Sequence, residues 1–360
     1  MAKLLFMGKL LFMGKLFKRS LIVLLALLVT PTAANTWPVE QRHPFDQQLQ
    51  QARELQYTPL TSAKQHWRIC VLMPHLKDTY WTGINYGLVQ QAKALELDMQ
   101  LFEAGGYYQV DKQLSQLDYC LKHQFDAILL GSVVPDLLDR YQPPINKPVI
   151  ALVNRVNHPQ INTRIGVNWY QMGYHAGQYL RQHAADNSQV ALFTGPDKQG
   201  GSDLVEQGLT AALAESTVKI MSVHHTDNNR NLYRDQINQL LASATPDYIL
   251  GSAVAIEAAV AIVQQRQLQQ KVQLLSSYLS PAVLRGIYRK RIAYSNDDSV
   301  VLQGKLAIDV TVRELQGEPA FGDIGPRINQ QRIDHISEDV LSQGLAPADY
   351  YPLYRVNSGD

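Results

Sequence analysis

Ten short apolar runs, separated by amphipathic segments, constrain the fold of this 360-residue chain more than any other feature. The runs span 69–73, 99–104, 127–132, 148–154, 164–168, 189–195, 218–225, 248–253, 272–278 and 291–296. The segments between them, such as GLVQQAKAL at 87–95, carry apolar residues at helical spacing. Strands that alternate with helices of this length indicate βαβ units and parallel sheets. Ten strands suffice for two sheets, so the sequence predicts an α/β fold with two doubly wound parallel-sheet lobes.

The first 34 residues have the pattern of a secretory signal peptide. They combine a basic start, an apolar run from Leu21 to Val29 and a small-residue exit, TPTAA, that ends at Ala34. The apolar run is shorter than the roughly 20 residues that a membrane-spanning helix needs, although a membrane anchor remains the alternative. The exit carries no cysteine for lipid attachment. The pattern therefore predicts cleavage and a mature protein that is free in the periplasm.

Composition and motifs argue against nucleic-acid binding and catalysis. Without residues 1–34, 28 basic residues face 32 acidic ones, so no basic face for nucleic acid is expected. The neighbouring His224 and His225 would point to opposite faces of a strand and could not easily hold one metal ion. The glycine-rich GPDKQGGS at 195–202 lacks the spacing of a phosphate-binding loop and is more typical of a plain turn. We therefore predict no enzyme activity, no metal and no cofactor.

Two cysteines, Cys70 and Cys120, are the only ones in the chain. Cys70 lies near the start of the first expected strand, and Cys120 lies near the end of the helix after the second. In a sheet of strand order 2-1-3-4-5, that helix crosses antiparallel to the first strand, which brings both residues to the same end. Because the periplasm is oxidising, we favour a disulfide between them. Two buried free thiols are the alternative.

Two of the four tryptophans fall where a ligand is expected rather than where a core is expected. Trp81 ends KDTYW and Trp169 lies in VNWYQMGY, and each of these polar segments follows a strand-like run and begins a helix. In open α/β sheets, ligands bind in the crevice outside the carboxyl ends of the strands. Both indoles are therefore candidates for ligand contact.

Several unusual segments carry a resemblance to a known family. They are LKDTYWTGINYG (76–87), EAGGYYQ (103–109), AILLGS (127–132), VNWYQMGY (167–174), GPDKQGGS (195–202), SSYLS (276–280) and YSNDD (294–298). With them the chain resembles the type I periplasmic binding proteins. Within that family it is most similar to the sensors of trimethylamine N-oxide that act with a membrane histidine kinase.

The resemblance implies two lobes joined by a hinge of three strands. It places lobe one at 67–166 and 277–318 and lobe two at 167–276 and 319–335, with an N-terminal extension at 35–66 and a C-terminal tail at 336–360. It also implies that the protein binds trimethylamine N-oxide, closes, and alters the periplasmic domain of a sensor histidine kinase. The membrane is then involved only through that kinase.

The chemistry of this ligand suggests an aromatic cage. Aromatic faces attract a methylated, formally cationic nitrogen by about 0.5 to 2 kcal/mol per ring, and the oxide needs a donor such as a phenol or indole. A carboxylate near the nitrogen would add attraction. The expected ligand-binding residues are Asp78, Tyr80, Trp81, Tyr107, Trp169, Tyr278 and Asp297.

Each of these residues also has a structural alternative. One of Tyr80 and Trp81 could pack against the sheet, Trp169 could fill the hinge, and Tyr107 could anchor a loop. The aspartates at 78 and 297 could simply cap helices.

A second function stays open, namely a solute receptor for an ABC importer of a sugar or small amine. Sugar receptors surround hydroxyl groups with many Asp, Asn and Arg side chains. The strand ends of this chain supply mainly Tyr and Trp, and Arg155 is the main exception. A ligand screen by thermal shift separates the two functions.

Overall fold

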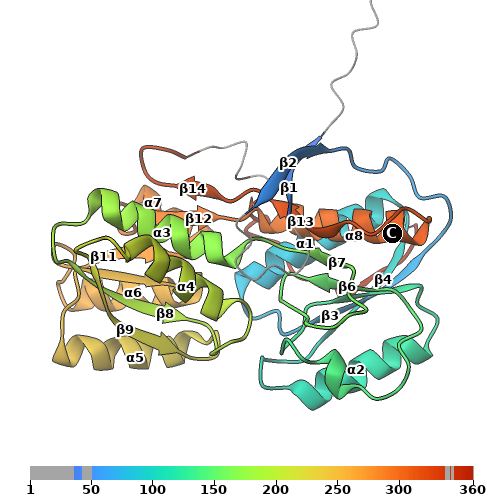
Figure 1. Ribbon diagram of the computed structural model, residues 1–360, viewed down its shortest axis with the longest axis horizontal. Helices are drawn as coiled ribbons and strands as arrows, with labels where there is room; N and C mark the ends of the chain where they lie inside the picture. The colour runs from blue at the N-terminus through green and yellow to red at the C-terminus, as the bar shows by residue number, and fades with distance from the viewer. Residues whose placement is uncertain (1–35, 43–50, 337–340, 342–343, 360) are drawn as a thin grey trace, which may run out of the picture. The chain divides into compact units, whose positions relative to one another are not determined.

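The computed structural model describes residues 36–42, 51–336, 341 and 344–359. The expected signal peptide, 1–34, lies outside these residues. Within the described ranges, no helix combines the length and apolar character that crossing a membrane requires. The described residues form two α/β lobes, each built on its own sheet (Figure 1).

The first lobe contains a mixed sheet. Its spatial order is β15 (Arg355–Val356), β4 (Asp98–Glu103), β3 (Arg68–Met73), β5 (Ala127–Leu130), β6 (Val149–Leu152), β7 (Thr163–Ile165), β13 (Gly322–Pro326), β1 (Trp37–Arg42) and β2 (Ala52–Tyr57). The central run β4-β3-β5-β6-β7 is parallel and has the 2-1-3-4-5 order of a doubly wound fold. The outer strands β15, β1 and β2 are antiparallel to their neighbours, and β15 and β2 form the two edges of the sheet.

The second lobe repeats this order. Its sheet runs β14 (Asn329–Gln331), β12 (Tyr294–Asp297), β11 (Gln273–Ser276), β10 (Tyr248–Gly251), β8 (Gln189–Thr194) and β9 (Lys219–His225). Strands β9-β8-β10-β11-β12 are parallel, again in the order 2-1-3-4-5, and β14 adds antiparallel at one edge. The two doubly wound lobes expected from the sequence are thus confirmed, and all ten expected strands are present close to their expected bounds.

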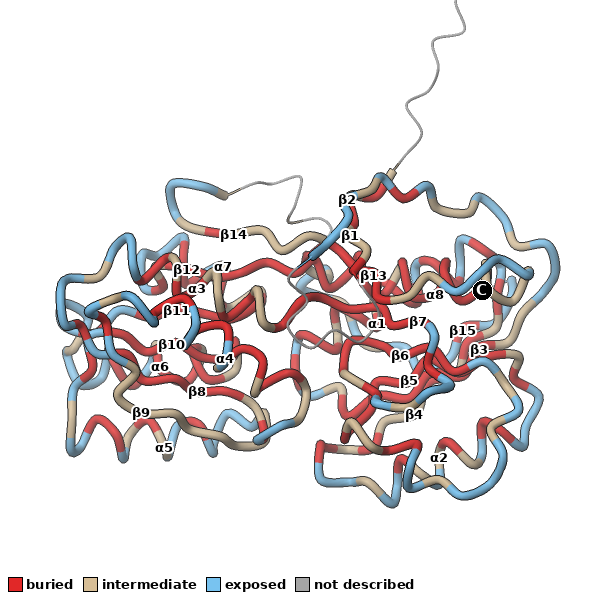
Figure 2. Tube along the Cα trace, viewed as in Figure 1, coloured by how far each residue is buried: buried red, intermediate tan, exposed pale blue. Residues whose placement is uncertain are grey.

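Helices cover both sheets and explain why the central strands are apolar along their whole length. Lobe one carries α1 (Thr79–Ala94), α2 (Val110–Lys122), a short η1 (Leu138–Arg140) and α8 (Val300–Leu315); lobe two carries α3 (Trp169–His183), α4 (Ser202–Leu213), α5 (Arg230–Ser243), α6 (Ala253–Gln265) and α7 (Pro281–Tyr288). Strands buried on both faces read as continuous apolar runs, as AILL in β5 and VIAL in β6 do. In Figure 2 the central strands are mostly buried and the outer faces of the helices are exposed.

The chain crosses between the lobes three times, but not at all the expected residues. The crossings lie between β7 and α3, between β12 and α8, and between β13 and β14. Lobe two therefore extends to Asp297, not to 276, because β12 pairs in parallel with β11 and is buried on both faces. The segment 319–335 also divides, since β13 joins the sheet of lobe one and only β14 joins that of lobe two.

The N-terminal extension and the C-terminal tail both add to the sheet of lobe one. β1 pairs with β13 and β2, and β15 pairs with β4. The sequence shows no continuous apolar run at these strands, because β2 and β15 are the edges of the sheet and β1 lies next to β2. β2 has the sequence ARELQY and is mostly exposed, so it carries no apolar run.

The structure joins Cys70 of β3 and Cys120 of α2 in a disulfide, with their Cα atoms 6.1 Å apart. Both residues are fully buried. The bond ties the first strand of lobe one to the helix that follows the second strand, 50 residues further along the chain.

Candidate functional site

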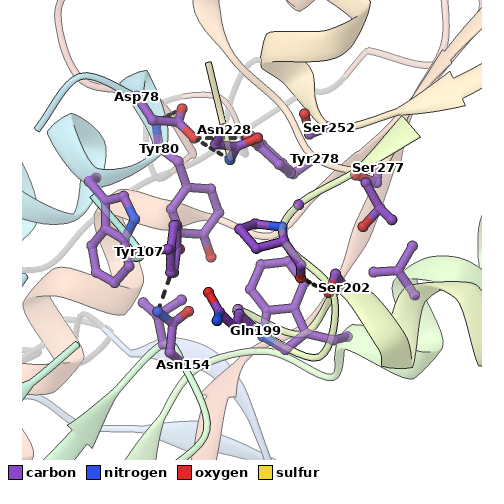
Figure 3. A pocket seen from close by; sticks show the side chains of 18 residues that line it. Asp78, Tyr80, Tyr107, Asn154, Gln199, Ser202, Asn228, Ser252, Ser277 and Tyr278 are labelled. Atoms are coloured by element: carbon purple, nitrogen blue, oxygen red, sulfur yellow. Dashed lines mark hydrogen bonds between the residues drawn. The ribbon is translucent and has the colours of Figure 1, made fainter. Parts of the chain in front are cut away.

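A cavity of about 50 Å³ lies where the strand ends of the two lobes face each other. Lobe one contributes the loops after β3, β4 and β6, and lobe two contributes the start of α3 and the loops after β8, β9, β10 and β11. Figure 3 shows these side chains converging from both lobes. Of the expected ligand-binding residues, the cavity brings together Asp78, Tyr80, Trp81, Tyr107, Trp169 and Tyr278.

Tyr80 occupies the centre of an aromatic cluster. Its ring centroid lies 6.0 Å from that of Trp81, 6.0 Å from that of Trp169 and 5.1 Å from that of Tyr278. The contacts with Trp81 and Tyr278 are edge-on, so the ring faces point in different directions. Trp169 and Tyr278 belong to lobe two, and the cluster is therefore assembled from both lobes.

Trp81 belongs to the protein core as well as to the cavity lining. Only 2% of its surface is exposed, and it packs in the same apolar cluster as the strands of lobe one. A Cβ atom on Gly131, at the end of β5, would lie 2.9 Å from its Cη2 atom. Trp81 therefore packs against the sheet, as the structural alternative expected, and it also lines the cavity.

Tyr107 follows Gly105 and Gly106, which both have positive φ and turn the chain toward the cavity. Its hydroxyl is 3.5 Å from Nδ2 of Asn154. The rings of Tyr107 and His75 pack edge to face, with their centroids 5.6 Å apart. Burial raises the pKa of the Tyr107 phenol to about 12, so it remains a neutral donor at physiological pH.

Asp78 has two roles: it caps a helix, and it forms hydrogen bonds at the cavity. Its Oδ1 accepts from the backbone N–H of Tyr80 at 2.9 Å and so caps α1. Its Oδ2 accepts from the hydroxyl of Tyr278 at 2.9 Å and from Nδ2 of Asn228 at 3.0 Å, and both of these donors belong to lobe two. Burial raises the pKa of the Asp78 carboxyl, while the bonds to Tyr80, Tyr278 and Asn228 oppose that rise.

Asp297 does not line the cavity, which corrects the prediction for this residue. Its Oδ1 accepts from the backbone N–H of Ser299 at 3.0 Å, and its Oδ2 accepts from Gln331 at 3.0 Å, so it holds the crossing before α8. Its neighbour Asp298 faces the other way, toward the phenol of Tyr80 and the amide of Gln303. Burial raises the pKa of Asp297 to about 6 and that of Asp298 to about 7.

The cavity is also lined by polar residues that were not among the expected ligand-binding residues. They are Asn154, Thr194, Gln199, Ser202, Asn228, Ser252 and Ser277. Thr194, Ser252 and Ser277 lie at or directly after the carboxyl end of a strand, which is the signal that could have identified them. Gln199 and Ser202 lie in GPDKQGGS, so this segment lines the cavity as well as turning the chain.

Among the described residues, two polar atoms of the cavity lining are buried without a hydrogen-bond partner. They are Nε1 of Trp169 and Oε1 of Gln199. Buried polar atoms are almost always paired, so each such atom calls for an explanation. Two residues of the lining thus each keep one buried polar atom, a donor and an acceptor, without a partner.

Arg155 lies outside the cavity lining and forms an ion pair instead. Its Nη2 atom is 2.8 and 2.9 Å from the two carboxylate oxygens of Asp203, and both side chains are partly exposed. Because Arg155 belongs to lobe one and Asp203 begins α4 of lobe two, the pair spans the two lobes. The guanidinium that suggested a sugar site therefore does not reach the cavity.

The adjacent histidines contact different groups. Nε2 of His224 bonds the hydroxyl of Ser222, while Nδ1 of His225 bonds the carbonyl of Gly195. Within the part of the chain that the structure describes, no three His, Cys, Asp or Glu side chains are grouped so that they could hold a metal ion.

Comparison with known proteins identifies the family. The model of the periplasmic binding proteins and sugar binding domain of the LacI family matches residues 66–351. The chain belongs to this family. As a periplasmic binding protein it is a ligand-binding protein and not an enzyme, and its compartment is the periplasm.

Among relatives of this periplasmic binding protein is the periplasmic protein TorT of Escherichia coli (strain K12). It is 37% identical over 299 residues, which are 82% of this chain and 86% of that protein. A chain in the crystal structure of the TorS sensor domain–TorT complex in the presence of TMAO has 32% sequence identity to this protein. The match covers 80% of this chain and 99% of that chain, with a TM-score of 0.72. An ABC transporter solute-binding protein of Bradyrhizobium sp. BTAi1 with bound bis-tris is 31% identical, covers 88% and 98%, and has a TM-score of 0.75.

Proposed function

We propose that this periplasmic binding protein binds trimethylamine N-oxide in its interlobe cavity and signals to the periplasmic domain of a sensor histidine kinase. The observation that carries the proposal is the cluster of Tyr80, Trp81, Trp169 and Tyr278, which two lobes assemble around one small cavity beside the carboxyl group of Asp78.

The size of the cavity favours a very small ligand. A cavity needs roughly 10–15 Å³ of such volume to hold one water molecule, so about 50 Å³ offers space for only a few small groups. Trimethylamine N-oxide, with a nitrogen, an oxygen and three methyl groups, is a ligand of only five heavy atoms. A hexose, with six carbons and six oxygens, is far larger. The small volume of the cavity therefore favours the amine oxide over a sugar.

The chemistry of the lining matches the two ends of this ligand. The aromatic faces and the carboxyl group of Asp78 attract the methylated nitrogen. The unpartnered indole N–H of Trp169 is a donor for the oxide. Binding energy per ligand atom has a ceiling of about 1.5 kcal/mol, so micromolar affinity is the most that so small a ligand can reach.

The signalling half of the proposal is supported by the TorT relatives. A crystal structure at 32% identity contains the TorS sensor domain bound to TorT in the absence of ligand, and another contains the same complex with TMAO. The similarity spans 80% of this chain, including both lobes.

Calorimetric titration tests the proposal. We expect micromolar to submillimolar binding of trimethylamine N-oxide and no binding of ribose or galactose. Ligand at 100 times its Kd should stabilise the protein by about 2.7 kcal/mol in thermal unfolding. Trp169→Leu should weaken binding at least tenfold, while Tyr351→Leu, at a side chain that is 83% exposed, serves as the control. Binding of a sugar but not of the amine oxide would refute the proposal.

Transport is the second candidate function, because the Bradyrhizobium relative is a solute-binding protein of an ABC transporter. Its bound bis-tris is a tertiary amine that is much larger than a cavity of about 50 Å³ accommodates. Titration with bis-tris in the same experiment tests this second function. Tight binding of bis-tris without binding of the amine oxide would favour an importer.

A further inference from the structure

We infer that Asn228 is a positioning residue that holds the two lobes closed by donating to Asp78 across the cavity. We call the bond from Nδ2 of Asn228 to Oδ2 of Asp78 the closure contact. The inference rests on the proposed function in that it names what keeps the proposed ligand site assembled. It also goes beyond that function, because the effect of the closure contact on the separation of the lobes can be measured without any ligand.

The closure contact joins a loop of each lobe. Asp78 lies between β3 and α1, and Asn228 lies between β9 and α5. Nδ2 of Asn228 is 3.0 Å from Oδ2 of Asp78 and 3.2 Å from the hydroxyl of Tyr278, which itself donates to the same Oδ2 at 2.9 Å. Figure 3 shows the amide and the carboxylate side by side at the edge of the cavity.

The amide of Asn228 is held in one orientation. Its Oδ1 accepts from the hydroxyl of Tyr233 at 2.9 Å, and that hydroxyl also lies 2.9 Å from the carbonyl oxygen of Thr194. Tyr233 is fully buried on α5. Turning the amide over would bring its oxygen against the carboxylate of Asp78, where two acceptors would repel each other. The amide is therefore preorganised to donate to lobe one.

Asp78 needs this donor because it has little else to stabilise its charge. It is 3% exposed, and among the described residues no Lys or Arg forms an ion pair with it. Of its three hydrogen-bond donors, the Tyr80 backbone belongs to its own lobe, while Tyr278 and Asn228 both come from the other. A buried carboxylate that loses such donors is strongly destabilised. Separation of the lobes must therefore replace both with water.

Several titratable groups face Asp78 and have to be accounted for in any pH series. They are His75 on the same loop, Asp227 beside Asn228, Glu257 on α6, Tyr278 after β11, Tyr80 on α1, Tyr107 after β4 and Tyr233 on α5. Burial lowers the pKa of His75, so this imidazole is neutral at pH 7.5. All of these groups are shared by wild type and variants. A difference between their pH profiles therefore reports on the substituted position.

Exchange of the two residues provides the decisive variant. In D78N/N228D, Oδ1 of the new asparagine still accepts from the Tyr80 backbone, and its Nδ2 donates to the new carboxylate. That carboxylate also accepts from the hydroxyls of Tyr233 and Tyr278. Every hydrogen bond of the network thus keeps a donor and an acceptor, and one carboxylate remains at the cavity.

The experiment measures closure and binding separately in N228D, D78N, D78N/N228D and the control D203N. Small-angle X-ray scattering without ligand reports the radius of gyration, and calorimetry reports the Kd for trimethylamine N-oxide. N228D places two carboxylates about 3 Å apart, where both cannot ionise. At pH 7.5 we expect a larger radius of gyration and about 10- to 100-fold weaker binding. At pH 5 most of the loss should be recovered, because one carboxyl is then protonated.

We expect D78N/N228D to regain the wild-type radius of gyration and to bind within about threefold of wild type at pH 7.5. D203N removes the partly exposed ion pair with Arg155 and should change binding by less than about threefold. The inference is overturned if N228D stays as compact as wild type, or if neither low pH nor the exchange restores its closure. If the scattering follows these expectations but no variant binds trimethylamine N-oxide, the closure contact stands and the ligand assignment fails.

Discussion

Replacing Gly201 by alanine should displace the indole of Trp169 and weaken ligand binding without removing any atom of the cavity. Gly201 precedes α4 with φ of +80°, a region that side chains with a Cβ rarely adopt. A Cβ atom at this position would lie 2.4 Å from Cγ, 2.5 Å from Cδ1 and 2.7 Å from Cδ2 of Trp169. The ring and the added methyl group cannot both keep their places.

The size of the effect follows from the geometry. Carbon atoms in contact lie about 3.5–4.0 Å apart, so the indole has to move by roughly 1 Å or more. If the ring no longer faces the ligand, its contribution of about 0.5 to 2 kcal/mol is lost. That energy corresponds to binding weaker by about 2- to 30-fold. The substitution should also lower the free energy of unfolding by about 1–3 kcal/mol through overpacking, which is measured separately.

Calorimetric titration with trimethylamine N-oxide measures the first effect, and urea unfolding measures the second. The control is Gly317→Ala after α8, away from the cavity, where φ is +90° and an added Cβ meets no atom within 4 Å, so the variant has the backbone strain without the clash. Gly317→Ala should bind within about twofold of wild type. Unchanged affinity of Gly201→Ala would refute the reasoning, as would an equal loss in both variants, since the effect would then not act through the indole.

Two further predictions concern stability. The Cys70–Cys120 bond joins residues 50 positions apart, so its reduction should lower the free energy of unfolding by about 4 kcal/mol. Urea titrations with and without dithiothreitol measure this difference. An intact mass that shows two free thiols in the purified protein would contradict the prediction. Burial raises the pKa of Asp297 to about 6 and that of Asp298 to about 7. Between about pH 4 and 7 the folded state therefore binds more protons than the unfolded state. The stability that these carboxyl groups contribute below about pH 4 is lost as the pH rises through that window. Urea midpoints from pH 4.5 to 7.5 should therefore fall more steeply in wild type than in Asp298→Asn, and parallel slopes would contradict this account.

The sequence was sufficient to predict the five parallel strands at the centre of each sheet, because burial on two faces makes most of these strands apolar runs. It was not sufficient for β2 and β15, which lie at the edges of the first sheet where such burial is absent, and β15 is only two residues long. The second crossing was expected after residue 276 rather than after Asp297. The strand β12, with the sequence YSND, is buried although most of its side chains are polar, and its pairing with β11 is what places it in lobe two.

The aromatic residues of the cavity were predictable because large rings in polar segments at strand ends are unusual. The polar residues were harder to predict. Asn228 lies in TDNNR, where it looks like an ordinary helix-capping residue, and nothing in this segment indicates a carboxylate on the other lobe. Asp297 and Asp298 are neighbours whose side chains contact different groups, and which of them approaches Tyr80 depends on the backbone at the crossing.

The small interlobe cavity also has a kinetic consequence. Its aromatic walls, Tyr80, Trp81, Trp169 and Tyr278, are each less than a tenth exposed, and they come from both lobes. Walls that come from both lobes move apart when the hinge between the lobes rotates. For a ligand held between them, the rate of that rotation would then set how quickly the site responds to a fall in ligand concentration.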